Sequence, residues 1–262
     1  MNAMGKIIPE ILEYTEGILN DAEAHAFSKP SKAARFLWKN RNLFVWSIMS
    51  NFEGMSITLP ETEVILNGST VGDLSIQDVL KVRAYGRALE SLCMDVRDGI
   101  FVPDRYSLIE LHRIAAKYEI DDDELGCFRR ENVAFRNVRW RPPSYLDLKY
   151  YWPQVERHVS SKKDMEEHAL VMFLALSRIQ FFPDVNKRTA MLFCNGYLMN
   201  GGKTPFLIPQ EEKVRFTTLL HDFYESGKAD AMLKFLAETS LVKPEKEQGE
   251  QREGMDGEKF QL

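Results

Sequence analysis

The sequence predicts an all-α domain that carries one small β-hairpin. Apolar residues recur at helical spacing along most of the chain, and residues 169–176 are apolar on every side. Residues 128–140 show no helical period and are followed by two prolines. With 262 residues, of which 44% are hydrophobic, the chain can build one sizeable core. We therefore expect one domain with short appendages.

Residues 1–60 are expected to form N-terminal helices that precede the main core. Isoleucine and leucine residues recur at helical spacing over residues 7–25, and a second amphipathic segment covers residues 36–46. Residues 56–75 contain a proline, two glycines and several threonines, as a connection would. The core is predicted to cover residues 61–242.

Six further helices are predicted in the core, over residues 76–92, 107–118, 164–179, 186–198, 211–226 and 229–241. The helix over 164–179 is expected to be buried on all sides, since its middle is entirely apolar. The next one should stop at Asn200, which two glycines follow. Residues 243–262 are polar, charged and glycine-containing, so we expect a disordered tail.

The small hairpin is predicted over residues 128–140, where Val133, Phe135, Arg136 and Val138 stand among polar residues. Five arginines and a single acid lie between residues 128 and 141. An arginine-rich hairpin favours an acidic target or nucleic acid, and the acidic balance of the whole chain argues against nucleic acid. A solvated basic hairpin with no partner is the plainer alternative.

The composition restricts the compartment and the kind of partner. The net charge of −5 gives no global sign of nucleic-acid binding, so an anion site must be local. Three widely spaced cysteines show no metal-binding spacing and read as buried thiols in a reducing compartment. The chain shows no signal-peptide pattern and no apolar run long enough to cross a membrane. We expect a cytoplasmic protein without a membrane partner.

The sequence QFFPDVNKRTA, residues 180–190, joins two apolar predicted helices and gathers an acid, an amide and two cations. The first backbone N–H groups of a helix that begins at Asn186 attract anions. Lys187 and Arg188 add positive charge for phosphate, and Asp184 is a natural Mg²⁺ ligand. An ordinary helix-to-helix turn, capped by Asp184 or Asn186, explains the same residues, and the loop alone favours it.

The order of these residues resembles the signature of the Fic/Doc (Fido) family, His-x-Phe-x-Asp/Glu-Gly-Asn-Gly-Arg-x-x-Arg. Four loop residues hold matching positions: Phe182, Asp184, Asn186 and Arg188. Residues 126–143 are similar to the family's hairpin flap, and residues 50–54 resemble the segment that carries an inhibitory glutamate in some members. Residues 215–236 look like its closing helices. The resemblance covers roughly residues 40–240 and implies a Fic-like helical fold.

The resemblance implies a transfer reaction from ATP. In the family the leading His accepts a proton from a target hydroxyl while AMP, or in Doc a phosphoryl group, is transferred. Here Gln180 holds that position, and a Gln amide cannot accept a proton near neutral pH. No histidine lies close in sequence, and His112, like the other four, is expected to be a surface or partly buried residue rather than a substitute base. Folding could still bring one of them close.

The resemblance also assigns roles to the other loop and flap residues. It implies that Asp184 holds Mg²⁺ and that ATP is bound by Asn186, Lys187 and Arg188. A target protein would dock on the flap at Val133, Phe135 and Arg136. Each of these assignments is carried over from the family's positions.

Two departures concern regulation and loop shape. Met191 replaces the family's last Arg, so the regulatory Glu53 would have to pair with Arg188 or Lys187 instead, or form no ion pair and be a plain acid at the end of a helix. Val185 and Lys187 replace two glycines, and a β-branched residue disfavours positive φ. We therefore expect ordinary dihedrals or a changed loop shape.

Three functions follow from these residues. The first is a Fic-fold protein of the AMP-transferase superfamily that has a degenerate site with weak or no transferase activity and retains ATP and Mg²⁺ binding. The second is an active AMP- or phosphoryl-transferase with a substitute base. The third is a non-catalytic interaction module that uses the basic flap.

Overall fold

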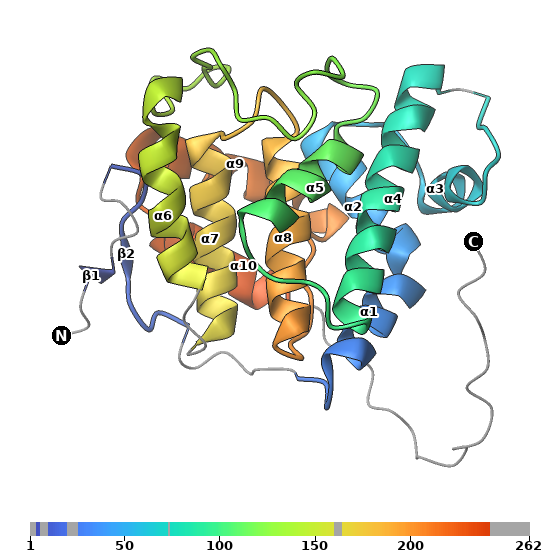
Figure 1. Ribbon diagram of the computed structural model, residues 1–262, viewed down its shortest axis with the longest axis horizontal. Helices are drawn as coiled ribbons and strands as arrows, with labels where there is room; N and C mark the ends of the chain where they lie inside the picture. The colour runs from blue at the N-terminus through green and yellow to red at the C-terminus, as the bar shows by residue number, and fades with distance from the viewer. Residues whose placement is uncertain (1–3, 6–9, 20–25, 73, 160–163, 242–262) are drawn as a thin grey trace.

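The structure is a computed structural model that describes residues 4–5, 10–19, 26–72, 74–159 and 164–241. In these ranges the chain forms ten α-helices and one small two-stranded sheet, so the predicted all-α architecture is confirmed (Figure 1). The predicted disordered tail lies outside the described residues. None of the helices formed by the described residues is long and apolar enough to span a bilayer.

Two helices at the centre position the site. They are α7 (Met165–Ile179) and α8 (Asn186–Asn200), which pack side by side (Figure 1). Residues 169–179 are buried without exception, as the continuous apolar run predicts. The loop that connects these two helices lies at one end of the bundle.

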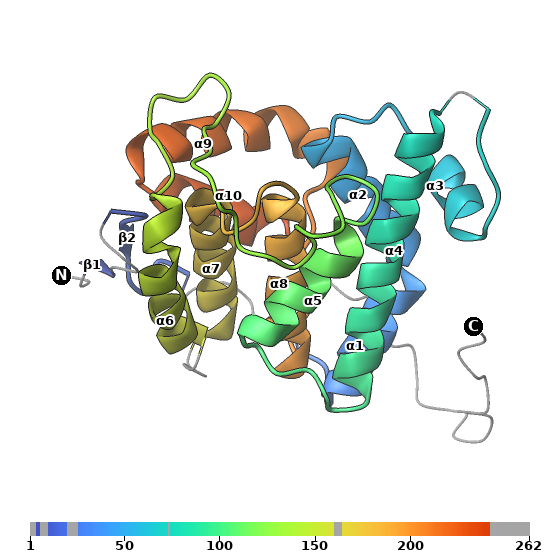
Figure 2. The same ribbon diagram turned by 45° about the horizontal axis from the view of Figure 1, so that its top comes forward.

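The other helices surround this pair. Their bounds are α1 (Pro30–Lys39), α2 (Arg41–Phe52), α3 (Leu59–Leu66), α4 (Ile76–Arg97), α5 (Arg105–Ala115), α6 (Leu148–Val159), α9 (Lys213–Ser226) and α10 (Asp230–Thr239). The helix α6 lies against α7, while α5 and α4 pack against α8 (Figure 1). Figure 2 shows α9 crossing the end of α7 that leads into the loop.

Side-chain caps fix where several helices begin. Ser75 accepts a hydrogen bond from the Asp78 N–H at the start of α4, and Asp104 does the same for Ser107 at the start of α5. Thr58 and Glu61 form a reciprocal capping box that begins α3. Residues 56–75 were predicted to be a connection, so the helix α3 was not predicted.

The predicted helix over residues 7–25 is wrong across residues 10–19, which form turns and the strand β2 (Tyr14–Thr15). This strand pairs with β1 (Met4–Gly5). The backbone of Glu13 bonds instead to the junction between α9 and α10, through Gly227 O at 2.9 Å and Ala229 N at 2.9 Å. Tertiary bonds thus replaced the local helix that the apolar spacing indicated.

The predicted hairpin is also wrong: residues 128–141, all described, contain no strand. This stretch, here called the 128–141 segment, arches over the helices as an irregular loop (Figure 1). Side chains take the place of a strand ladder. Arg139 N donates to Glu225 Oε1 at 2.9 Å, and Phe135 stacks on Tyr224 with ring centroids 4.1 Å apart. Binding to α9 therefore occupies groups that a hairpin would pair internally.

Candidate functional site

The candidate site is the loop between α7 and α8. Gln180 ends α7 and Val185 precedes α8, and both adopt left-handed backbone conformations, with φ of 56° and 60°. The expectation of ordinary dihedrals was therefore wrong. A β-branched residue is strained in this conformation. Burial of the Val185 side chain in the core holds it there.

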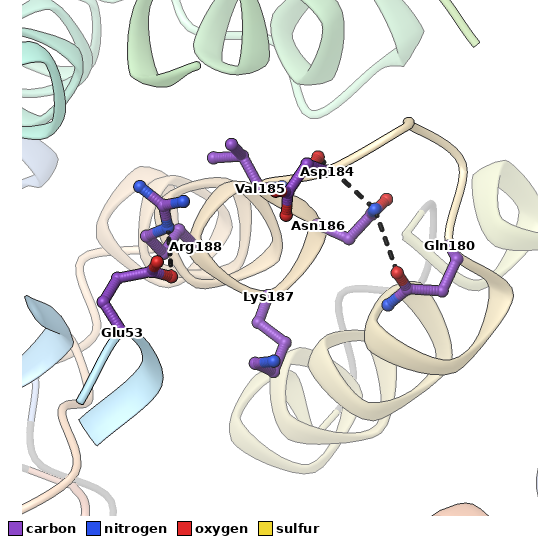
Figure 3. A pocket seen from close by; sticks show the side chains of 7 residues that line it. All are labelled: Glu53, Gln180, Asp184, Val185, Asn186, Lys187 and Arg188. Atoms are coloured by element: carbon purple, nitrogen blue, oxygen red, sulfur yellow. Dashed lines mark hydrogen bonds and ion pairs between the residues drawn. The ribbon is translucent and has the colours of Figure 1, made fainter. Parts of the chain in front are cut away.

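Asn186 braces the loop from inside. Its Oδ1 accepts the Phe182 N–H at 2.9 Å, and its Nδ2 donates to Phe182 O at 2.8 Å. The same Nδ2 donates to Gln180 Oε1 at 3.1 Å (Figure 3). These bonds join both ends of the loop, so Asn186 fixes the direction in which the first turn of α8 faces.

Gln180 is bonded to the protein at both ends of its amide. Its Nε2 donates to Ser177 O at 2.6 Å, while its Oε1 accepts from Asn186. Its backbone carbonyl accepts a hydrogen bond from Arg129 Nε at 2.6 Å. An amide in this arrangement can orient a neighbouring group, but it cannot take up a proton.

His112 reaches the loop from α5, although 72 positions separate it from Asp184. Its Nδ1 accepts the Gly126 N–H at 3.1 Å, so its Nε2 carries the proton and donates to Asp184 O at 3.3 Å. Its ring stacks on Phe182, with centroids 3.8 Å apart. Burial lowers the pKa of His112 to about 4, so the ring is neutral. The expectation of a surface or partly buried histidine was wrong.

Arg188 is fully buried and pairs with two carboxylates. Its Nε lies 2.9 Å from Glu53 Oε1 (Figure 3). Its two terminal nitrogens donate to Glu119, Nη1 to Oε1 at 2.6 Å and Nη2 to Oε2 at 2.7 Å. Burial by itself lowers the pKa of Arg188. The hydrogen bonds that Arg188 donates to Glu119 and the negative charge of Glu53 have a larger combined effect and raise the pKa above its ordinary value.

Glu119 was missed by the sequence analysis. It lies 69 positions before Arg188, in the turn after α5, and no spacing rule connects the two. Because Met191 replaces the family's last Arg, the sequence offered Arg188 and Lys187 as partners for Glu53. In the structure Glu53 contacts Arg188. The remaining cation, Lys187, points away from the Arg188 guanidinium in Figure 3.

Lys187 and Asp184 complete the site. Burial lowers the pKa of Lys187, and the negative charge of Glu53 opposes that effect in part. Its Nζ lies 6.0 Å from the centre of the Phe52 ring. Asp184 is exposed and accepts the Val185 N–H at 2.6 Å through Oδ1. A carboxylate and a cation thus both line the pocket at the start of α8.

Seven residues line one small pocket at this loop: Glu53, Gln180, Asp184, Val185, Asn186, Lys187 and Arg188 (Figure 3). The structure therefore brings together every loop residue predicted for the site, and Glu53 with them. The space open to the centres of water-sized molecules is about 40 Å³, enough for a few waters or an ion. The flap residues Val133, Phe135 and Arg136 do not line it.

A Mg²⁺ ion shared with phosphate fits this set of donors. No group of three or more His, Cys, Asp or Glu side chains suited to a metal occurs in the described part of the chain. The protein would thus bind the Mg²⁺ ion through the Asp184 carboxylate alone. Mg²⁺ commonly binds through one or two carboxylates, and water and phosphate oxygens supply its other ligands. One exposed carboxylate beside a helix N-terminus meets that requirement.

Comparison with known proteins identifies the domain around this loop. Residues 103–198 match the model of the Fic/DOC family. The chain is similar to the protein adenylyltransferase Fic of Drosophila melanogaster, with 27% identity over 191 residues, 71% of this chain and 38% of that protein. The corresponding protein of Drosophila mojavensis is 25% identical over 71% of this chain and 37% of its own length. The chain thus spans less than half the length of these relatives.

Solved structures share the fold. Fic-1 from C. elegans superposes with a TM-score of 0.67 at 21% identity, over 85% of this chain and 66% of that one. A Fic domain containing signaling protein from Bacteroides thetaiotaomicron gives 0.63 at 21% identity, over 80% of this chain and 86% of that one. The predicted Fic-like helical fold is confirmed. Residues 103–198 of this chain thus match the Fic/DOC family model, and the chain shares the fold of these Fic structures.

Proposed function

We propose that this chain binds ATP with Mg²⁺ at the α7–α8 loop and transfers AMP or a phosphoryl group weakly or not at all. The observation that carries the proposal is Gln180, which stands where the family's base would act and has both ends of its amide bonded to the protein. Loss of a general base lowers a rate by about 10² to 10⁴. The names of the fly relatives, protein adenylyltransferases, favour AMP as the group transferred.

The rest of the loop supports phosphate binding. The helix α8 begins at Asn186, so the unpaired N–H groups of its first turn belong to residues that line the pocket. Lys187 adds a cation, and Asp184 would hold Mg²⁺, which neutralises phosphate charge when bound. These groups bind and orient a nucleotide without needing a base.

Glu53 supports a regulatory role in this proposal. Its carboxylate pairs with Arg188 at 2.9 Å, on the donors that a phosphate oxygen would use. A nucleotide phosphate and Glu53 therefore compete for the same cation. Glu53 follows the last residue of α2, and the space around the next residue, Gly54, is open.

His112 does not supply a substitute base. Both ring nitrogens are in hydrogen bonds, and the ring lies buried behind the loop against Phe182. An imidazole whose pKa is about 4 is also a weak proton acceptor near neutral pH. This placement favours the weak or inactive transferase over an active enzyme that uses this histidine.

A target protein would dock on the 128–141 segment. Arg130, Arg136 and Arg139 are exposed there, while Phe135 and Trp140 hold the segment on the domain. An exposed basic loop on an otherwise acidic chain favours an acidic partner segment. The same observation favours the interaction module as the second candidate function.

The test is calorimetric titration of ATP into the purified protein with and without Mg²⁺. We expect binding that depends on Mg²⁺ and is lost in Asp184→Asn, which removes the ligand charge at constant size. Asp222→Asn, at an exposed site on α9, is the matched control and should bind as the parent does. Absence of binding in the parent chain would overturn the nucleotide-binding part of the proposal.

Transfer is tested with labelled ATP and candidate target proteins. Gln180→His should create Mg²⁺-dependent labelling, because it restores a proton acceptor at the base position. The parent chain should label targets at least about 10²-fold more slowly. Robust labelling by the parent chain, lost in Asp184→Asn, would show that an active transferase is present and would refute the degenerate reading.

A further inference from the structure

Arg188 is held by two carboxylates that differ in burial and in geometry. The Glu119 side chain is 5% exposed and the Glu53 side chain 24%. Glu119 accepts hydrogen bonds from both terminal nitrogens, whereas Glu53 contacts Arg188 as an ion pair at Nε. A bidentate pair between an arginine and a carboxylate is stronger and more directional than a single contact.

The two carboxylates use different edges of one planar group. Glu119 occupies the end formed by Nη1 and Nη2, and Glu53 occupies the side that carries Nε. Because the guanidinium is rigid, fixing its end also fixes the direction of its side. Glu53, which contacts this side edge, lines the pocket together with Arg188.

Glu119 is itself fixed in the fold. Its backbone N–H donates to Ala116 O at 3.0 Å in the turn after α5, and Lys81 Nζ from α4 lies 4.0 Å from its Oε2. It therefore belongs to the contact between α4, α5 and α8. Glu53, by contrast, stands at the end of α2 before a glycine with open space around it.

We infer that Glu119 is a positioning residue that holds the end of the Arg188 guanidinium, so that its Nε edge stays directed into the pocket after Glu53 leaves. An anion that replaces Glu53 then meets an oriented pair of N–H donors. The consequence for ATP rests on the proposed function. The anchoring of Arg188 by Glu119 does not.

The anchoring is tested without nucleotide, by NMR of the arginine side-chain Nε–H groups. Arg188→Lys identifies the Arg188 signal, and the buried Arg129 and Arg178 serve as internal references. In Glu53→Gln we expect the Arg188 signal to persist with slow rotation of its terminal groups. In Glu119→Gln we expect that restriction to be lost while the reference signals remain.

Opposite results would overturn the inference. If Glu53→Gln frees Arg188, then Glu53 and not Glu119 is the anchor. This variant removes only the contact with the less buried of the two carboxylates, so the test stands even if Glu119→Gln fails to fold. If Glu119→Gln folds and leaves the rotation of Arg188 restricted, the positioning role is also refuted.

A titration of ATP gives the second readout. In the Glu53→Gln background, adding Glu119→Gln should weaken ATP binding about tenfold, the loss expected when a charged hydrogen-bonding group is no longer oriented. In a background that also carries Arg188→Lys, Glu119→Gln should have no further effect. A purely structural role would weaken binding equally in both backgrounds and would overturn the inference.

Together, the NMR experiment and the ATP titration distinguish a failure of the anchoring role from a failure of the nucleotide-binding proposal. If no variant binds ATP but the NMR results are as expected, nucleotide binding fails while the anchoring of Arg188 stands. If ATP binds in the parent chain and Glu119→Gln leaves both readouts unchanged, the nucleotide proposal stands and Glu119 has no positioning role.

Discussion

At the residue scale, His112 links two parts of the chain that approach the site from different directions. Its ring accepts a hydrogen bond from the N–H of Gly126, just before the 128–141 segment, and donates one to the carbonyl of Asp184. Only the neutral ring can do both, because a charged ring has no acceptor. Protonation would therefore break the bond to Gly126 and place a charge in the core.

This arrangement predicts how stability depends on pH. The pKa of His112 is about 4 when folded and near 6.5 when unfolded, so between these values only the unfolded chain takes up the proton. The stability that the neutral His112 ring contributes to the folded chain is fully present above pH 6.5 and is lost as the pH falls toward 4. His112→Gln should flatten the dependence of unfolding free energy on pH by about 1.4 kcal/mol per pH unit in this window.

The measurement is urea denaturation at several pH values between 4 and 6.5. His221→Gln, at a half-exposed position on α9, is the control and should leave the slope unchanged. Parallel curves for His112→Gln and the parent chain would show that the ring titrates in the folded chain as it does in the unfolded one.

At the element scale, close packing of α8 on its neighbours depends on a glycine. A Cβ at Gly196 would lie 2.6 Å from Phe101 Cζ and 2.7 Å from Leu92 Cδ1, inside normal contact distance. Both neighbours are buried and belong to α4 or follow it. The helix α8 can therefore pack this closely against its neighbours because residue 196 has no side chain.

Gly196→Ala should lower the unfolding free energy by about 1–3 kcal/mol, since the core must shift to admit the methyl group. Chemical denaturation measures the loss. Gly72→Ala is the matched control, because nothing lies within 4 Å of a Cβ there. It should be neutral or slightly stabilising. Equal effects of the two substitutions would contradict the packing argument.

The 128–141 segment is held to the loop by Arg129, which donates to the carbonyls of Gln180, Glu131 and Pro143. Arg129→Lys keeps the charge but cannot reach three acceptors with one ammonium group. Hydrogen exchange across residues 128–141 should therefore speed up at least about tenfold, because bonds from a charged donor contribute roughly 1.5–3 kcal/mol each. The exposed Arg130→Lys should leave exchange unchanged. Unchanged exchange in both variants would mean that aromatic stacking alone holds the segment.

Elements with a long apolar period could be predicted from the sequence, whereas contacts between distant segments could not. The central helix was clear because residues 169–176 are continuously apolar. Residues 10–19 carry a helical spacing but bond to α9 and α10 instead. The loop residues were found through their order. Glu119 and His112 were not, because nothing local marks a side chain that meets its partner about 70 positions away.

At the scale of the whole molecule, residues near the N-terminus complete the core formed by the last helices. Thr15 donates from its N–H and hydroxyl to Asp230, each at 2.7 Å, and Gly17 N donates to Glu167 at 3.0 Å. Arg178 bonds to Ile11 O and stacks over Trp140 at 3.8 Å. One buried arginine thus touches both the N-terminal stretch and the 128–141 segment.

Ile11 itself is completely buried. Ile11→Ala should lower the unfolding free energy by about 2–5 kcal/mol, as expected for a large side chain removed from a packed core. Ile76→Ala, at a position 80% exposed, is the control and should change stability little. If the two losses are equal in denaturation experiments, the N-terminal stretch is not part of the cooperative unit.

The glutamine at the end of α7 also has a genetic consequence. Codons for glutamine and histidine differ only in their final base. Asn186 already directs its amide toward position 180, and the pocket around it is assembled. A point mutation that leaves every other residue in place would therefore put an imidazole beside this pocket.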